Sequence, residues 1–383
     1  MICLLITIGI FGCRKDEPKP VPTPEIANRT VLVYMVAANT LGGAEADSAD
    51  IKEMTRAIIN GDLGNNRWVI YQSTYSNSRL YELTKNGMSM LKEYPSGSSV
   101  SIERMQSVID DSRNYAPAEK YGIVFWSHAN GWLEDGVDEG ISAKPLSFGQ
   151  DMNNRMNITS LRAAIENYGF DYLYFDCCLM GSVEVCYELS NCAEYIVASP
   201  SEIPLDGMPY DQNLKLLCDG SREALIEAAT NTFNHYNGKT SIYERSACMS
   251  VIDTQQLKGL TNATAAIYAL TPILHPLTTV TNYYGSSHTR QAYYLDFGEY
   301  VEALCESNSL DPALLVAYND AMSKAVIYCD ATEAMWNEYF IYNNSGLSTR
   351  VFIDAEDANI KGYDRLQWFA DVVSHHPEFS SNL

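Results

Sequence analysis

Short, uninterrupted runs of apolar residues alternate along the chain with longer segments of helical periodicity. The apolar runs are rich in β-branched and aromatic residues, and they cover 31–37, 68–71, 122–126, 172–175 and 195–198. Such runs are typical of strands that are buried on both faces of a sheet. Helical patterns cover 44–60, 102–113, 159–168 and 182–189. This alternation predicts an α/β fold with a mostly parallel sheet that is covered on both sides.

The C-terminal part of the chain is richer in helical patterns. A strand-like run at 247–252 leads into it, and helical periodicity follows at 255–269, 297–305 and 312–326. The last of these begins with a capping Asp311 and with Pro312 in the first turn, which is a helix start signal. We therefore expect a first domain over 25–249 and an α-rich extension over 250–383 that packs on it, so that the two form one large unit.

The N-terminal segment has the features of an export signal. Its apolar run at 2–11 is much shorter than the roughly 20 residues that a membrane-spanning helix needs. Gly12 and Cys13 follow, and this pair resembles the bacterial lipobox, in which a small residue precedes a lipidated cysteine. We expect a signal peptide over 1–12 and a lipidated Cys13. An ordinary cleaved signal and a buried strand are the alternatives.

A proline-rich stretch follows the cysteine. Proline occupies every second position from 18 to 24, and proline fixes φ and lacks a backbone donor, so 13–24 is expected to be an extended spacer. The whole N-terminal region thus indicates an exported lipoprotein of a bacterial cell envelope. Its lipid would face the periplasm or the outer surface.

Two chemically reactive side chains directly follow two of the predicted strands. His128 lies in the segment 127–132 after the third apolar run, and Cys177 and Cys178 lie in 176–182 after the fourth. In parallel α/β sheets, the groups that react gather beyond the carboxyl ends of the strands. A nucleophilic cysteine needs a nearby base, and a histidine at a neighbouring strand end supplies one. The start of a helix near Ser182 adds a positive dipole end that favours the thiolate.

These segments resemble the motifs of a known family. Residues 127–132 are similar to the histidine motif of the clostripain-like cysteine peptidases, and 175–185 are similar to their cysteine motif, within a resemblance that spans 29–370. The resemblance implies a caspase-like three-layer αβα sandwich, shared with gingipains and legumains, as a catalytic domain over 25–249. It also implies an endopeptidase with a His-Cys dyad that cleaves after a basic residue through a thioester. His128 would be the acid/base and Cys178 the nucleophile.

The sequence departs from the family pattern at two positions near these residues. Cys177 occupies the position of a usual Ala, and Ala129 replaces the usual Gly after the histidine. Side chains alternate along a strand, so Asp176 and Cys178 are expected on one side and Cys177 on the other. We therefore expect Cys178 to be the nucleophile and Cys177 to be a packing residue. Backbone N–H groups of Cys178 and of the loop after His128 are the natural oxyanion donors.

The resemblance also implies which residues select the substrate. The two aspartates of the family's specificity pocket fall on Asp176 and Asp206. A carboxylate binds a guanidinium through two parallel hydrogen bonds and an ammonium as a point charge, so Arg is expected before the cleaved bond and Lys is the second choice. An ordinary turn aspartate before a glycine is the alternative for Asp206.

Charge and composition exclude several other classes of function. The 383 residues include 26 Lys+Arg against 48 Asp+Glu, a net charge of -22, which argues against nucleic acid and suits protein or peptide substrates with basic residues. The acidic loop 133–140 could bind calcium, although a solvated loop is the simpler interpretation. No C-x-x-C, H-E-x-x-H, G-x-S-x-G or G-x-G-x-x-G pattern occurs, so we expect no metal and no cofactor.

Two other functions stay open at this point. One is a catalytically inactive caspase-like surface lipoprotein that binds a ligand. The other is a redox pair of Cys177 and Cys178, although adjacent cysteines form only a strained ring.

Overall fold

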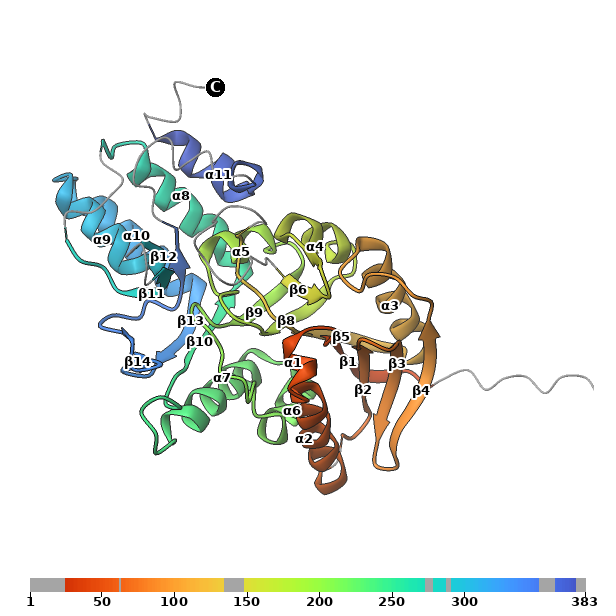
Figure 1. Cartoon of the computed structure of the whole chain (residues 1–383). Coiled ribbons are helices and arrows are strands. Elements are labelled where there is room, and N and C mark those ends of the chain that lie inside the picture. The colour runs from red at the N-terminus through yellow and green to blue at the C-terminus, as the bar shows by residue number, and fades with distance from the viewer. Residues whose placement is uncertain are drawn as a thin grey trace, which may run out of the picture.

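A computed structural model describes residues 25–61, 63–133, 148–272, 278–286, 291–350 and 362–376. Within these ranges, nine strands form one central sheet (Figure 1). In spatial order they are β13 (Val326–Ala331), β10 (Cys248–Asp253), β9 (Ala193–Ala198), β8 (Phe170–Asp176), β5 (Ala118–Trp126), β1 (Ala27–Val36), β2 (Asn66–Ser73), β3 (Ser78–Thr84) and β4 (Gly87–Tyr94). The fold is therefore mixed α/β, as the apolar runs predicted.

The five central strands are parallel, and the two outer strands at each edge pair antiparallel with their neighbours. β9, β8, β5, β1 and β2 pair in parallel, and they contain the five apolar runs of the sequence. The hairpin of β3 and β4 extends the sheet at one edge. β10 and β13 extend it at the other. Because all five parallel strands point the same way, their carboxyl ends share one edge of the sheet.

Helices cover both faces of the sheet and give it three layers. Alternate residues of β1 face opposite sides: Val31 and Val33 pack in one hydrophobic core, and Leu32 and Tyr34 pack in the other. On the side of Val31 lie α2 (Ala46–Asn60), α6 (Tyr210–Asp219) and α7 (Arg222–Asn237). On the side of Leu32 lie α3 (Ile102–Tyr115), α4 (Ile158–Ile165), α5 (Val183–Glu188) and α8 (Leu257–Tyr268).

The C-terminal part of the chain adds helices, small sheets and the two outer strands at one edge. Its further helices are α9 (Phe297–Ser307), α10 (Pro312–Ala325) and α11 (Gln367–Asp371), and its small strands are β11 (Asn282–Ser286), β12 (Gln291–Asp296), β14 (Ala334–Met335), β15 (Tyr339–Phe340) and β16 (Ser348–Thr349). The expected boundary between 249 and 250 falls inside β10, which pairs with β9 on one side and β13 on the other. The two parts of the chain therefore share one sheet.

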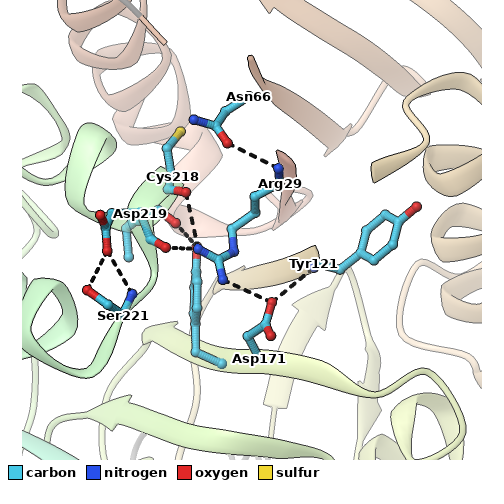
Figure 2. A network of polar contacts seen from close by, with 9 residues as sticks. Arg29, Asn66, Tyr121, Asp171, Cys218, Asp219 and Ser221 are labelled. Atoms are coloured by element: carbon cyan, nitrogen blue, oxygen red, sulfur yellow. Dashed lines mark hydrogen bonds and ion pairs between the residues drawn. The ribbon is translucent and has the colours of Figure 1, made fainter. Parts of the chain in front are cut away.

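A buried arginine joins the amino end of the sheet to α6 (Figure 2). Arg29, the third residue of β1, is 4% exposed and pairs with Asp171 of β8 at 3.1 Å. Its guanidinium also donates to the backbone carbonyls of Cys218, at 3.2 Å, and Asp219 at the end of α6. A Cβ on Gly220, the left-handed C-cap of this helix, would clash with the guanidinium of Arg29. This network secures the end of the sheet opposite to the reactive residues.

Candidate active site

The predicted histidine and cysteine come together because β5 and β8 end side by side. Trp126, the last residue of β5, pairs with Asp176, the last residue of β8. His128 and Cys178 each stand two residues further along the chain, and they line one cavity of about 300 Å³. The residues around this cavity are Leu41, Trp126, Ser127, His128, Asp176, Cys177, Cys178, Glu202, Ile203, Pro204, Leu205, Gly207 and Trp336.

Hydrogen bonds from the end of β1 support the loop that carries His128. Ser127 Oγ donates to the carbonyl of Val36 at 2.9 Å. Asn39 Nδ2 donates to the same carbonyl and to that of Gln150, both at 2.8 Å. Gln150 belongs to β6 (Phe148–Asp151), which forms a small hairpin with β7 (Asn154–Met156). Hydrogen bonds from the side chains of Ser127 and Asn39 to backbone carbonyls therefore link this loop to β1 and β6.

The imidazole of His128 hydrogen-bonds to a hydroxyl and not to the thiol. Its Nε2 lies 2.7 Å from Oγ1 of Thr40, in the short helix α1 (Thr40–Gly43). Burial lowers the pKa of His128, because a charged imidazolium loses hydration in the half-buried site. The lowered pKa favours the neutral imidazole, which carries one donor and one acceptor nitrogen.

The half-buried thiol of Cys178 contacts the segment that follows β9. Its Sγ accepts a hydrogen bond from the backbone N–H of Ile203 at 3.3 Å. Leu179, next in the chain, has a φ of 62° and donates its N–H to the Ser201 carbonyl at 2.9 Å. Burial, followed by the charge of Glu202, raises the pKa of Cys178 to about 12. The thiolate that we expected from the nearby helix start is therefore not favoured in this state.

The two adjacent cysteines have different environments. Cys177 is 2% exposed and belongs to the hydrophobic core, with its Sγ 3.1 Å from the carbonyl oxygen of Phe125. Cys178 is more accessible, and both are free thiols. Cys177 continues the alternation of β8, because it packs in the same core as Leu173 and Phe175 of that strand.

The two predicted substrate-binding aspartates lie in different places. Asp176 is 6% exposed and lines the cavity, where its Oδ2 accepts hydrogen bonds from Tyr210 Oη at 2.8 Å and Met208 N at 3.3 Å. Asp206 does not line this cavity. Its side chain is 70% exposed, pairs with Lys239 at 3.5 Å, and lines an adjoining cavity of about 330 Å³. In this structure the fold brings Asp176, but not Asp206, to His128 and Cys178.

Three residues of the site gave no signal in the sequence. Thr40 bonds to His128, and Trp336 donates its Nε1–H to a carboxylate oxygen of Glu202 at 2.7 Å beside the thiol. Burial raises the pKa of Glu202. None of the three belongs to a local motif, and Trp336 reaches the site from the turn between β14 and β15, far along the chain.

Several predictions concern residues outside the described ranges or features that those ranges lack. The lipidated Cys13, the spacer 13–24 and most of the acidic loop 133–140 lie outside the described residues. Within the described part, no helix is both long enough and apolar enough to cross a bilayer. The same part contains no group of three His, Cys, Asp or Glu side chains arranged to hold a metal ion.

Two solved structures resemble this chain over nearly its whole length. An inactive zymogen C11 protease from Parabacteroides distasonis is 26% identical and superposes with a TM-score of 0.77, over 91% of this chain and 99% of that one. A secreted C11 cysteine protease from Bacteroides thetaiotaomicron, solved with an irreversible peptide inhibitor, is also 26% identical, with a TM-score of 0.75 over 90% and 98%. No curated protein matches significantly.

A family model gives the same result from the sequence. The model of the clostripain family matches residues 33–376, which include both strand ends and the cavity between them. The central sheet, with helices on both faces, is also the fold of the two similar proteases. The chain therefore belongs to the clostripain family of cysteine proteases.

Proposed function

We propose that the protein is an exported cysteine endopeptidase that cleaves peptide bonds after a basic residue, Arg in preference to Lys. The observation that carries this proposal is the single cavity of about 300 Å³ that Cys178, His128 and Asp176 line together. It combines a nucleophile, a neutral base and a buried carboxylate that a cationic side chain can reach. Membership of a cysteine protease family supports the reaction class.

The reaction proceeds through a thioester. The Cys178 sulfur attacks the carbonyl carbon of the scissile peptide bond, and its proton passes to the neutral His128. The imidazolium then protonates the leaving amine as the C–N bond breaks, which leaves an acyl-enzyme. Water, deprotonated by His128, attacks the thioester, and the proton returns to the sulfur. Backbone N–H groups of Cys178 and of the loop after His128 are the proposed oxyanion donors.

The dyad is neutral before substrate binds. The raised pKa of Cys178 and the lowered pKa of His128 both keep the proton on sulfur in the empty site. Proton transfer therefore accompanies the attack on bound substrate, and a preformed thiolate–imidazolium pair is not needed. The contact of Cys178 with Ile203 must give way for the thiol to reach the imidazole, which Thr40 holds through Nε2.

Asp176 is the proposed carboxylate for the basic side chain, and Asp206 is a second one that substrate recruits. The guanidinium of arginine matches a carboxylate through two parallel hydrogen bonds, whereas lysine offers a point charge. The ion pair of Asp206 with Lys239 is exposed, and exposed pairs contribute only about 0–1 kcal/mol. Little therefore holds Asp206 away from an arriving cation.

Export and anchoring rest on the N-terminal sequence. The signal-like segment 1–12 and the lipobox-like Gly12-Cys13 support a lipoprotein of a bacterial cell envelope. The similar protease from Bacteroides thetaiotaomicron is described as secreted. Lipidation of Cys13 would place the folded part at the end of the proline-rich spacer.

The direct test is an assay of the purified protein with reporter peptides that end in Arg, Lys or a neutral residue. We expect cleavage in the order Arg, Lys, neutral, and no cleavage by Cys178→Ala. Cys177→Ala is the matched control and should keep its activity, because that thiol faces the core. Activity that survives Cys178→Ala and is lost in Cys177→Ala would reverse the assignment.

One observation favours the alternative, an inactive surface lipoprotein that binds a ligand. The thiol and the imidazole each bond to another group in this structure. An arginyl chloromethyl ketone separates the two functions, because it alkylates only a working nucleophile beside a basic-residue site. Labelling of Cys178 supports the peptidase. Absence of labelling, together with binding of an arginine peptide, supports the inactive protein.

A further inference from the structure

A second buried aspartate lies behind the floor of the active-site cavity. Asp50, on α2, is 4% exposed, and its Oδ2 accepts a hydrogen bond from Trp126 Nε1 at 2.6 Å. Trp126 itself lines the cavity. Asp50 also lines the adjoining cavity that contains Asp206. It therefore stands in the wall between the two cavities, although nothing in the local sequence marks it.

Asp50 and Asp176 face the same point. A Cβ on Gly207 would stand 3.0 Å from Oδ2 of Asp176 and 3.3 Å from Oδ2 of Asp50. Gly207 has a φ of 66°, lines the active-site cavity, and has no side chain that could separate the two carboxylates. The two carboxylates therefore approach each other at Gly207, although Asp50 belongs to α2 and Asp176 to the end of β8.

Within the described ranges, no cation of the protein neutralises this pair. Among the ion pairs in the described ranges, none includes Asp50 or Asp176. Two ionised carboxylates in a buried site repel each other and lose hydration. Burial, followed by the charge of Asp176, raises the pKa of Asp50, and burial raises the pKa of Asp176. At neutral pH the empty pair therefore retains a proton.

The other titratable groups around Asp50 do not remove this effect. Glu53 on α2 and Asp206 in the loop before α6 are acidic and add to the repulsion. Tyr210 of α6 and Tyr236 of α7 are neutral phenols whose pKa values are raised, in part by these carboxylates. On this side Lys239 lines the adjoining cavity and pairs with Asp206, and burial lowers the pKa of the neighbouring His235, which favours its neutral form.

We propose that Asp50 is a specificity residue that binds the basic side chain of the substrate together with Asp176. Binding of this side chain releases to solvent the proton that the empty pair holds. The inference rests on the proposed function and extends it. A guanidinium has donors along more than one edge, so it can bridge two carboxylates that face one point. An ammonium is a compact charge that bridges them less well, which gives a physical reason for preferring Arg.

The first test is Asp50→Asn, assayed with matched reporters that end in arginine or in its neutral analogue citrulline. We expect kcat/KM for the arginine reporter to fall about 10- to 100-fold, mainly through KM, with the citrulline rate unchanged. The matched control is Asp47→Asn, which neutralises another buried aspartate one turn earlier on α2, where it accepts from Gln72 at 2.7 Å. Equal losses for both reporters in Asp50→Asn would make its role structural and overturn the proposal.

The second test uses the unmodified protein and does not depend on how the variant folds. KM for the arginine reporter should fall as pH rises through the neutral range, because binding must displace a proton from the empty pair. KM for the citrulline reporter should show no such slope. In Asp50→Asn the slope should disappear. An arginine KM that does not change with pH in the unmodified protein would overturn the proposal.

A binding measurement separates this inference from the proposed function. If the protein cleaves none of the reporters, the peptidase proposal fails, and acetyl-arginine amide is then titrated calorimetrically into Cys178→Ala. If the heat of binding depends on the ionisation enthalpy of the buffer, binding is linked to proton release. Loss of this dependence in the double variant Cys178→Ala, Asp50→Asn would still support proton-linked cation binding. Absence of binding, or binding without proton release, would refute the role of Asp50.

Discussion

Oγ1 of Thr40 lies 2.7 Å from Nε2 of His128, so a hydroxyl from the first residue of α1 holds the proposed acid/base. A neutral imidazole has one donor and one acceptor, and a hydroxyl can serve either of them. Asn39, immediately before Thr40, donates to the backbone carbonyls of Val36 at the end of β1 and of Gln150 in β6. The orientation of His128 thus depends on a residue that lies 88 positions earlier in the chain.

Replacing Thr40 by Val should therefore lower kcat and leave KM for an arginine reporter nearly unchanged. A net hydrogen bond contributes about 1 kcal/mol, which corresponds to about a fivefold loss. Thr40→Ser keeps the hydroxyl and should restore the rate. Steady-state kinetics of both variants decide the matter, and equal rates for Val and Ser would show that the contact does not position the imidazole.

Replacing Glu202 by Gln should make Cys178 more reactive toward iodoacetamide. The carboxylate of Glu202 raises the pKa of the thiol, after burial, and a raised pKa means less thiolate at a given pH. Removing the charge should move the whole alkylation curve to lower pH and raise the rate at neutral pH about two- to fivefold. The amide keeps the partner of Trp336 Nε1. A curve that moves to higher pH would contradict the sign of this effect.

Replacing Asp206 by Asn tests whether substrate recruits this exposed carboxylate. If it does, kcat/KM for the arginine reporter should fall more than about tenfold, since a hydrogen bond to a charged group contributes about 1.5–3 kcal/mol. Lys239→Met is the control, because it frees Asp206 from its ion pair and should not slow cleavage. An unchanged rate in Asp206→Asn would remove this residue from the site.

Replacing Cys13 by Ala should release the protein from the membrane fraction of the producing bacterium. The reason is that the thioether-linked lipid has no other attachment point in the expected signal sequence. Cys3→Ala is the control and should leave the protein in the membrane, because Cys3 belongs to the segment that processing removes. Fractionation and mass spectrometry of the N-terminal peptide measure both outcomes. Retention of Cys13→Ala in the membrane would argue against a lipid at this position.

The sequence predicted those elements whose signal is local. Continuous apolar runs identified all five parallel strands, because a strand that is buried on both faces has no polar alternation. The hairpin β3–β4 gave no such run, since its residues are half exposed at the edge of the sheet. β13 was not predicted either. All its residues are half buried, and only pairing with β10 makes it a strand of the central sheet.

The sequence by itself determined the α/β class, the family, and the two strand ends that carry His128 and Cys178, because strand patterns and short motifs depend on neighbours in the chain. Only the tertiary structure decided what each side chain meets. It buried Cys177 and left Cys178 at the cavity, brought Asp50 to Asp176 at Gly207, and left Asp206 outside. These outcomes follow from contacts between distant segments and from loss of hydration on burial, and neither is encoded at any one position.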